Sequence, residues 1–445
     1  MSRRARKAED RPIETAVIRD LTTDGRGVTE IDGKAIFVDA AIRGELVSFR
    51  RQKQRKKFDE AELIEVIEAS PDRVEAPCKY FSICGGCSLQ HINPKAQLSV
   101  KQDALMQALE RIGGLQPDKV LPPLAGQPLG YRRRARLGAK LVEKKGRVLV
   151  GFREKRKPYI ADMLSCETLE PRLGALIEPL TELIESLSIK RQLPQIEMSL
   201  GDAVMSLVFR VLQSPSANDC LLLQTFGERF EADIWLQTGG PGTLAPLHSD
   251  KLPQPLWYAL PDFNLRLEFG PLDFIQVNQD MNLRMISQAL ALVGSLEGKH
   301  VLDLFCGIGN FSLPLATRAA SVTGIELEQS MVEKAQANAA ANGIKNAEFF
   351  AADLSRTDTL PVLQGEDKSF DLIVLDPPRA GALEVLPQVA ATGAPQILYV
   401  SCHSGSLARD AGILVHEYGY RLKSAGAMDM FPQTSHVEAM ALFER

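Results

Sequence analysis

The carboxyl-terminal part of the chain is predicted to be an α/β domain with a doubly wound, mainly parallel sheet. From residue 299 onward, short apolar runs alternate with helical segments, which is typical of a parallel sheet covered by helices. The first apolar run, 301–305, leads into a glycine-rich turn at 306–310. The following runs end at polar residues that suit ligand binding or catalysis, namely Glu326, Asp353, Asp376 and Cys402.

The alternation predicts the elements of this domain in order. The expected strands lie at 301–305, 321–325, 348–351, 372–375 and 396–401, with helices after residue 310 and at 328–341. In open sheets of this kind, ligands bind outside the carboxyl ends of the strands. The polar residues at the strand ends are therefore expected to line a single site.

The overall composition predicts a globular protein with several domains. A chain of 445 residues with 45% hydrophobic content can bury two or three cores. We expect boundaries at 12–69, 70–265 and 266–445. The segment 95–113 is expected to be helical, with Leu98, Leu105, Leu109 and Ile112 near one face, and to pack on either the central or the C-terminal domain. No run approaches the roughly 18 apolar residues of a membrane span, and no apolar leader precedes the seven cysteines. We therefore expect a cytoplasmic monomer with no membrane and no obligate protein partner.

Charge is distributed unevenly along the chain. The formal net charge is -4, yet residues 1–57 carry 15 Lys or Arg against 9 Asp or Glu, and residues 131–157 carry 12 against 2. Either run alone would be read as a solvated surface. The two together indicate an RNA-binding front attached to an acidic body.

Residues 12–69 are predicted to form a small all-β unit, because short alternating runs are separated by turn signals. Asp32-Gly33 favours a hairpin turn with positive φ at both positions. One run leads into a basic stretch, Arg50 to Lys57, of the kind with which OB-like barrels bind nucleic acid. Through Asp24-Gly25-Arg26-Gly27-Val28 and Gly33-Lys34-Ala35-Ile36-Phe37-Val38, the unit resembles the TRAM domain, a small RNA-binding barrel of RNA-modifying enzymes.

The central region, 126–265, is predicted to be a mixed α/β domain. From 134 to 141 apolar residues alternate with Arg134, Arg136 and Lys140, so one face of a strand packs while the other is basic. This basic face is expected to hold an RNA backbone. Cys220 precedes three leucines and is interpreted as part of an apolar core strand.

Three cysteines, Cys78, Cys84 and Cys87, are spaced closely enough to suggest a metal site rather than disulfides in a cytoplasmic protein. Cys166 is the natural fourth ligand, because it is the only other cysteine between this cluster and the strands of the central domain. Four thiolates suit zinc and a [4Fe-4S] cluster equally well.

The glycine-rich turn and the strand-end carboxylates together indicate a nucleotide-like cofactor. Glu326 can accept hydrogen bonds from ribose hydroxyls, and Asp353 can accept one from an adenine amino group. Each carboxylate alone could equally be a helix cap. Their order favours S-adenosylmethionine, and residues 270–445 resemble class I methyltransferases, which are Rossmann-like. Cys306, inside the turn, is interpreted as packing.

Further motifs resemble, in order, the uracil-C5 RNA methyltransferases. They are Phe274-Ile275-Gln276-Val277-Asn278, Asp303 to Asn310, Asp376-Pro377-Pro378-Arg379, Val400-Ser401-Cys402 and Thr434-Ser435-His436-Val437-Glu438. A strand-end cysteine alone is more often buried packing than a nucleophile. The resemblance implies that Cys402 is the nucleophile and Glu438 the base, with the cofactor surrounded by Gln276, Phe305, Asn310, Glu326, Asp353 and Asp376.

The resemblance also implies a reaction and a substrate. Uracil C5 is a weak nucleophile, so a thiolate must first add at C6 before C5 takes a methyl group and loses its proton. The barrel, the four cysteines and the catalytic motifs together resemble bacterial methyltransferases that act on 23S ribosomal RNA. Those enzymes carry a [4Fe-4S] cluster on this cysteine arrangement, whereas relatives acting on transfer RNA are expected to lack barrel and cluster.

Several alternatives stay open. A related enzyme that methylates two sites in 23S ribosomal RNA, or one acting on another RNA, would share these motifs. Cytosine-C5 methyltransferases usually place a cysteine where Asp376-Pro377-Pro378 stands here, and N-methyltransferases usually place an aromatic residue at Arg379. A non-catalytic RNA-binding or ribosome-assembly factor would explain the basic runs but not the catalytic motifs.

Overall fold

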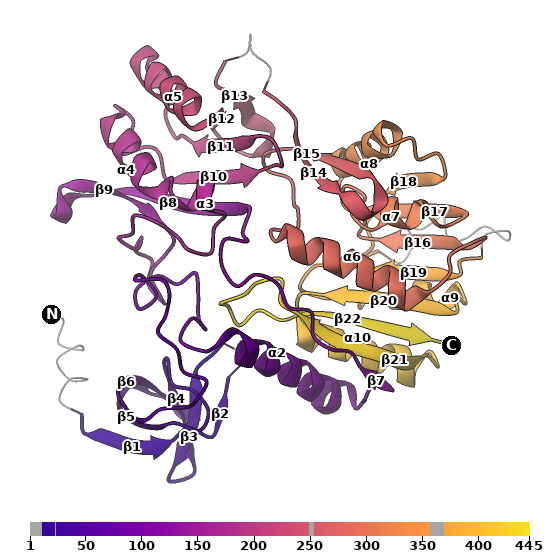
Figure 1. Ribbon diagram of the computed structural model, residues 1–445, viewed down its shortest axis with the longest axis horizontal. Helices are drawn as coiled ribbons and strands as arrows, with labels where there is room; N and C mark the ends of the chain where they lie inside the picture. The colour runs from indigo at the N-terminus through magenta and orange to yellow at the C-terminus, as the bar shows by residue number, and fades with distance from the viewer. Residues whose placement is uncertain (1–10, 23, 249–252, 357–368) are drawn as a thin grey trace.

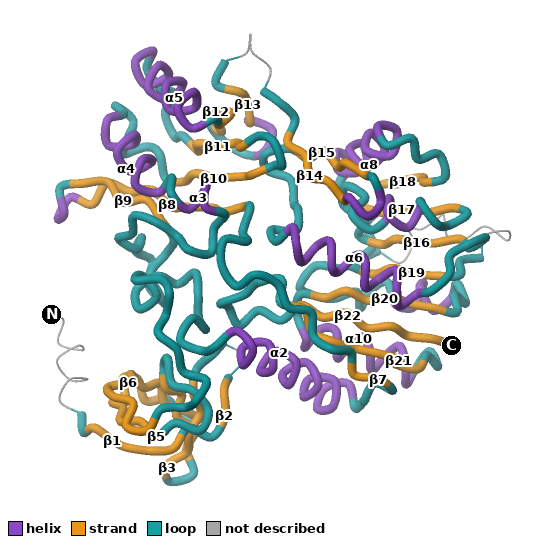
Figure 2. Tube along the Cα trace, viewed as in Figure 1, coloured by secondary structure: helices purple, strands orange, loops and turns teal. Residues whose placement is uncertain are grey.

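The computed structural model describes residues 11–22, 24–248, 253–356 and 369–445. The chain forms three regions built on separate sheets, which follow one another from the indigo N-terminal sheet to the orange and yellow C-terminal sheet in Figure 1. Long irregular segments connect the regions, as the teal tube in Figure 2 shows. Within the described residues, no helix combines the length and apolar character required to span a bilayer.

The N-terminal region is a six-stranded sheet in the order β1-β5-β6-β4-β3-β2. The segment that carries β1 and β2 pairs first with β5 and then with β3, so it contacts both ends of the sheet. Asp32 and Gly33 have φ of 53° and 72°, which confirms the predicted hairpin turn. The strands are β1 (Ile13–Val17), β2 (Asp20–Leu21), β3 (Gly27–Ile31), β4 (Lys34–Val38), β5 (Leu46–Gln54) and β6 (Phe58–Glu68).

The basic run of this region divides into paired and exposed residues. Arg51 is held by Glu14 and Asp59, with N–O distances of 2.6 and 2.8 Å. Lys56 and Lys57 lie exposed in the turn between β5 and β6. The exposed cations of this turn, rather than Arg51, are therefore available for a phosphate backbone.

The central region is a mixed sheet in the order β13-β12-β11-β10-β8-β9. Ala135, Leu137 and Ala139 are buried on one face of β8, as the alternation predicts. The elements are β8 (Arg134–Val142), η2 (Glu143–Lys145), β9 (Arg147–Gly151), α3 (Pro171–Gly174), α4 (Ile177–Ser186), β10 (Gln195–Leu200), β11 (Met205–Arg210), α5 (Ala217–Phe230), β12 (Ala232–Gln237), η3 (Pro241–Thr243) and β13 (Leu244–Pro246).

The interpretation of Cys220 as part of a core strand is wrong. Cys220 lies half-buried in α5, whose first turn is fixed by a capping box in which Ser216 and Asp219 bond to each other's backbone. The run of leucines after Cys220 therefore belongs to a helix, with Leu223 buried and Leu221 exposed.

The C-terminal region contains an eight-stranded sheet in the order β18-β17-β16-β19-β20-β22-β21-β7. The first five strands pair in parallel, whereas β22 runs antiparallel to both β20 and β21. The predicted doubly wound alternation is confirmed. The strands are β7 (Lys119–Val120), β16 (His300–Leu304), β17 (Ser321–Glu326), β18 (Ala347–Ala351), β19 (Leu372–Leu375), β20 (Gln396–Ser401), β21 (Arg421–Met428) and β22 (Glu438–Glu444).

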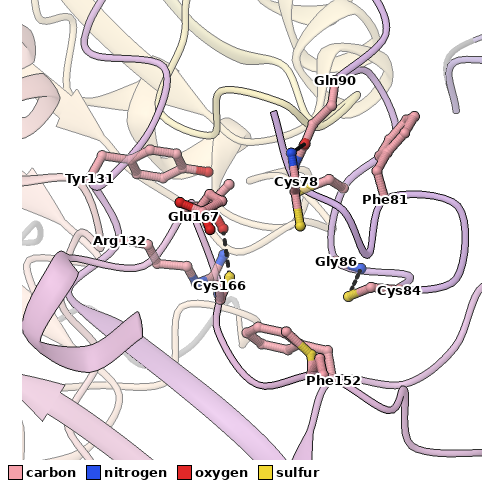
Figure 3. A pocket seen from close by; sticks show the side chains of 13 residues that line it. Cys78, Phe81, Cys84, Gly86, Gln90, Tyr131, Arg132, Phe152, Cys166 and Glu167 are labelled. Atoms are coloured by element: carbon pink, nitrogen blue, oxygen red, sulfur yellow. Dashed lines mark hydrogen bonds between the residues drawn. The ribbon is translucent and has the colours of Figure 1, made fainter. Parts of the chain in front are cut away.

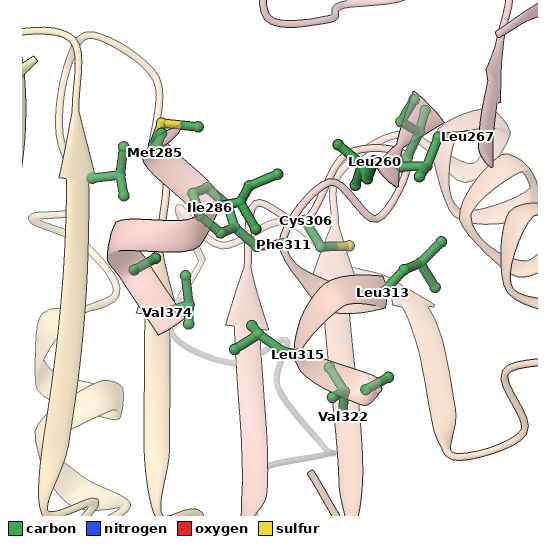
Figure 4. Close-up of a cluster of buried hydrophobic side chains, with 14 of the residues drawn as sticks. Leu260, Leu267, Met285, Ile286, Cys306, Phe311, Leu313, Leu315, Val322 and Val374 are labelled. Atoms are coloured by element: carbon green, nitrogen blue, oxygen red, sulfur yellow. The ribbon is translucent and has the colours of Figure 1, made fainter. Parts of the chain in front are cut away.

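Helices cover both faces of this sheet, and a hairpin adds to its core. An apolar cluster joins Leu260 and Leu267 of the hairpin to Met285 and Ile286 of α6, with Cys306 packed among them (Figure 4). The elements are β14 (Leu256–Leu260), η4 (Pro261–Phe263), β15 (Leu265–Phe269), α6 (Gln279–Val293), α7 (Ser312–Ala316), α8 (Gln329–Ala341), α9 (Leu386–Ala391) and α10 (Ser404–His416).

The segment expected to be helical at 95–113 packs against the C-terminal sheet. It forms α2 (Pro94–Ala108) and one π-helical turn, η1 (Leu109–Gly113), which contact α10 and β21. Leu105 and Leu109 are buried in the same cluster as the strands of the large sheet. Ile112, predicted for the same face, is 57% exposed, because a π-helical turn shifts the phase of the helix.

We expect Leu105→Ala to destabilise the C-terminal region, since it leaves a cavity between α2 and the sheet. Truncation of a buried leucine costs about 2–5 kcal/mol, whereas the exposed Ile112→Ala on the adjoining turn is expected to change stability by less than about 0.5 kcal/mol. Thermal unfolding of both variants measures the difference. Equal melting temperatures would mean that α2 does not pack into this core.

Candidate active site

One cleft of about 1430 Å³ lies at the carboxyl edge of the large sheet and extends toward the central region. Glycine-loop and strand-end residues from the C-terminal region line it together with residues of the central sheet such as Arg136. It brings together all eight residues expected to bind the cofactor or to act in catalysis: Gln276, Phe305, Asn310, Glu326, Asp353, Asp376, Cys402 and Glu438.

Strand direction explains why these residues meet. Glu326 ends β17, and Asp376 and Cys402 directly follow β19 and β20, which are parallel. Because β22 is antiparallel to β20, it begins at the edge where β20 ends. The register pairs Ser401 with Ala439, so the next positions along the two strands, Cys402 and Glu438, lie opposite each other.

The glycine-rich turn after β16 approaches the cleft closely. Phe305, Gly307 and Gly309 have positive φ values of 66°, 56° and 94°. The value at Phe305 is unusual for a residue with a side chain and is typical of a strained functional turn. The backbone N–H of Gly307 donates to Oε2 of Glu326 at 3.1 Å, which connects this turn to the end of β17.

Asn310 and Asp353 are fixed by their neighbours. The side-chain oxygen of Asn310 accepts hydrogen bonds from Tyr258 Oη and Asn282 Nδ2, both at 2.9 Å. Asp353 accepts from the backbone and hydroxyl of Ser355 at 3.0 and 2.6 Å, and these bonds lower its pKa. Asp353 therefore accepts hydrogen bonds within a local turn, not at the start of a described helix, and it also lines the cleft.

Burial perturbs the acids of the cleft. Glu438 is 6% exposed, and burial, together with the nearby charge of Asp376, raises its pKa to about 8. Burial also raises the pKa of Asp376 to about 7. The pKa of the Cys402 thiol is raised by burial and by the charges of Glu438 and Asp376, although Arg379 opposes the shift. Such shifts cluster at catalytic sites, where proton transfer is required.

The two histidines near Cys402 differ in role. His403 is the N-cap of α10, and its Nδ1 accepts a hydrogen bond from the backbone N–H of Ser406 at 3.1 Å. This contact makes His403 a structural residue. His436 packs on the ring of Phe431, and burial lowers its pKa, so it is held mainly in the neutral form.

The connector between β21 and β22, residues 429–437, is held by N-terminal segments. Gln97 of α2 donates to Oε1 of Gln433 and accepts from its backbone N–H, each at 3.0 Å. The backbone N–H groups of Ser88 and Leu89 donate to the Gln433 carbonyl at 2.9 and 3.0 Å, and Tyr131 Oη donates to the Pro432 carbonyl. Sequence reasoning missed these contacts because they join residues far apart in the chain.

A sequence profile of the family described as tRNA (Uracil-5-)-methyltransferase matches residues 95–445. The chain belongs to this family of uracil-C5 RNA methyltransferases. The match begins at α2 and includes every residue of the cleft.

Full-length relatives of this methyltransferase carry a more specific name. The 23S rRNA (uracil(1939)-C(5))-methyltransferase RlmD of Methylococcus capsulatus is 47% identical over 430 residues, covering 97% of this chain and 96% of the relative. The protein of the same name from Alkalilimnicola ehrlichii is 47% identical over 446 residues, covering 100% of this chain and 99% of the relative.

A solved structure shares the fold over nearly the whole chain. Pyrococcus abyssi tRNA (uracil-54, C5)-methyltransferase, crystallised with S-adenosyl-L-homocysteine, has a TM-score of 0.72 at 24% identity and covers 97% of this chain and 100% of its own. This coverage includes the N-terminal sheet. We expected enzymes that act on transfer RNA to lack the N-terminal barrel. This expectation is wrong for the Pyrococcus abyssi enzyme, whose fold includes this region.

The four cysteines expected to bind metal line a second cavity of about 230 Å³ in the methyltransferase. Figure 3 shows Cys78, Cys84 and Cys166 around it, and Cys87 completes the set. Burial raises the pKa of the Cys87 thiol to about 12. Among the described residues, no three His, Cys, Asp or Glu side chains are grouped as ligands of a single ion.

The predicted basic face of β8 is partly neutralised. Arg134 is mostly buried, donates to the Leu272 carbonyl at 2.7 Å and pairs with Glu197, which also pairs with Arg136. Arg136 and Lys140 are exposed, and Arg136 lines the cleft. Arg134 thus connects the central sheet to the catalytic region, while the other two cations remain accessible.

We expect Gln97→Ala to loosen the connector that precedes Glu438. The substitution removes a pair of buried hydrogen bonds to Gln433, which costs about 1–3 kcal/mol. Hydrogen exchange of the amides of Gln433 and Ser435 should accelerate accordingly. Gln107→Ala, at an exposed position of the same helix, is the matched control, and equal exchange in both variants would contradict the assignment.

Proposed function

We propose that the chain methylates C5 of a uridine in 23S ribosomal RNA, at the position named for its RlmD relatives. The observation that carries this proposal is the opposition of Cys402 and Glu438 across β20 and β22 in the cleft that also contains the cofactor carboxylates. Methylation at uracil C5 requires a nucleophile that attacks C6 of the uracil and a proton acceptor close to C5. Cys402 and Glu438 lie together at the carboxyl edge of the sheet and can supply these two groups.

In the proposed mechanism, the Cys402 thiolate adds to C6 of the target uracil, which makes C5 nucleophilic. Bound S-adenosylmethionine supplies an electrophilic methyl group. Glu438 then removes the proton from C5, the electron pair of the C–H bond restores the C5–C6 double bond, and the bond from C6 to the Cys402 sulfur breaks. Because C5 and C6 are inaccessible in a stacked base, the uridine must leave its stack.

The proposed cofactor residues have complementary tasks. Glu326 accepts hydrogen bonds from ribose hydroxyls and Asp353 accepts one from the adenine amino group. Gln276, Phe305, Asn310 and Asp376 would surround the rest of the cofactor together with the glycines of the turn. The positive φ values of the turn and the hydrogen bond from Tyr258 to Asn310 support this arrangement, since contacts within the chain fix both.

We further propose that Cys78, Cys84, Cys87 and Cys166 hold a [4Fe-4S] cluster. A cavity lined by four thiols and by Phe81, Phe152 and Met163 suits a polynuclear group that is shielded from water. Methylation needs no electron transfer, so the cluster is proposed to be structural. It would stabilise the loop that continues into Ser88 and Leu89, which contact the connector before Glu438.

RNA is proposed to contact the N-terminal and central regions. A TRAM-type barrel at 12–69 offers Lys56 and Lys57, and the central domain at 70–265 offers Arg136 and Lys140 beside the cleft. The catalytic domain at 266–445 would then receive the flipped base. A ribosomal substrate implies that the reaction takes place in the bacterial cytoplasm.

The ribosomal substrate is preferred over transfer RNA because relatives at 47% identity carry the 23S name, whereas the transfer-RNA enzyme is 24% identical. Since the fold of that enzyme also covers the N-terminal sheet, the barrel alone does not distinguish the two substrates. An enzyme that modifies a second 23S uridine remains the related alternative.

The covalent step gives the first test. With 23S RNA containing 5-fluorouridine and S-adenosylmethionine, we expect a complex that survives denaturing electrophoresis, because fluorine cannot be removed as a proton. Cys402→Ala should form no complex, while Cys220→Ala, on α5 and outside the cleft, should retain it. Mapping the cross-linked nucleotide identifies the target.

Absence of the complex in wild-type protein that binds both RNA and cofactor would overturn the assignment of Cys402. In that case, transfer of labelled methyl groups to cytosine or to exocyclic nitrogen would indicate the cytosine-C5 or N-methylating alternative. Binding of RNA without any methyl transfer would indicate a non-catalytic factor.

The metal proposal predicts about four iron atoms per chain after anaerobic purification. Cys166→Ser should lower the iron content and the visible absorbance of the cluster, whereas Cys220→Ser, on the surface of α5, should leave both unchanged. Stoichiometric zinc in place of iron would contradict the cluster and leave the same four ligands with a different metal.

A further inference from the structure

Lys101 is an unusual residue for its position. It lies on α2, outside the large sheet, and its side chain is 1% exposed. A buried ammonium group requires compensating partners. Its Nζ contacts Asp429 Oδ1 at 2.6 Å and the Phe431 carbonyl at 3.0 Å.

Both partners belong to the connector that leads to the proposed base. Asp429 directly follows Met428, the residue of β21 that pairs with Glu438 of β22. Lys101 therefore contacts the connector directly after the end of β21, next to the position where β22 begins. Its charge acts on Glu438 through space, since no hydrogen bond joins the two among the residues that the structure describes.

We infer that Lys101 is a positioning residue for the methyltransferase reaction, which fixes the connector that leads to Glu438 and so holds this carboxyl group in place for removal of the C5 proton. This inference rests on the proposed function of Glu438. Lys101 touches neither RNA nor cofactor in this assignment. It acts through Glu438, and the proton moves from uracil C5 to the Glu438 carboxylate.

The groups around Glu438 determine the sign of the effect. Asp376 after β19, Cys402 after β20 and Asp429 after β21 contribute negative or ionisable groups, and His436 lies in the connector. Burial and Asp376 raise the pKa of Glu438, whereas the charge of Lys101 lowers it. A group with a raised pKa stays protonated to higher pH, so we expect kcat to rise as the pH increases through the pKa of Glu438.

Removal of the Lys101 charge should raise the pKa of Glu438 further. The acid limb of kcat for Lys101→Met should therefore move to higher pH, and kcat at pH 7 should fall by about tenfold. The KM for RNA should not change, because Lys101 is buried away from the RNA surface. Lys101→Arg, which keeps the charge, should retain the wild-type limb.

Two adduct assays separate this role from a merely structural one. On ordinary uridine RNA, Lys101→Met should accumulate a covalent enzyme–RNA adduct that carries the labelled methyl group, because only proton removal is impaired. On 5-fluorouridine RNA, it should form as much adduct as the wild type, since addition of Cys402 and methyl transfer precede that step. In Lys101→Met, the buried carboxylate of Asp429 loses its partner. The double variant Lys101→Met with Asp429→Asn also removes this charge and should give the same two adduct results as Lys101→Met.

The exposed Lys95→Met, six positions earlier on the segment of α2, is the matched control and should match the wild type throughout. An unmoved acid limb, or loss of both adducts in the single and double variants, would overturn the inference. Failure of the wild type to form the 5-fluorouridine adduct would instead overturn the proposed function itself.

Discussion

The C-terminal region depends on one constraint, which is the burial of acidic side chains at the edge where the parallel strands of the large sheet end. Glu438 begins β22, which is antiparallel to β20, and Asp376 directly follows β19, which is parallel to β20, so the sheet buries two acids beside one thiol. Burial makes a carboxylate a stronger base but disfavours its charged form. A site built in this way needs a nearby cation, and the large sheet obtains one from α2.

The N-terminal segments thus support the proposed catalytic site as well as extending the proposed RNA surface. Gln97, Ser88 and Tyr131 all bind the connector before Glu438, and β7 pairs along β21 at the edge of the sheet. The cysteine loop and the base are consequently parts of one continuous hydrogen-bonded network. Disturbance of that loop would reach the site through the backbone of the connector, which also carries Phe431 of the cleft.

Most of the catalytic fold could be predicted from the sequence because strand ends coincide with polar residues after apolar runs. The opposition of Cys402 and Glu438 depends on the antiparallel register of β22, which no local pattern specifies. Lys101 was missed because a lysine on a helix is usually exposed, although its spacing from Leu105 follows the buried face. Misplacement of Ile112 and Cys220 reflects a π-helical turn and a capped helix, which apolar periodicity alone does not reveal.

The pairing of Gln97 with Gln433 spans 336 residues of chain. At translation rates of about 5–20 residues per second, α2 would leave the ribosome on the order of tens of seconds before its binding site is synthesised. During that interval the strands against which Leu105 and Leu109 pack would not yet be present. The apolar face of this helix is therefore exposed until the strands of the large sheet follow, and a chain that terminates before β22 would lack part of this core and the proposed base.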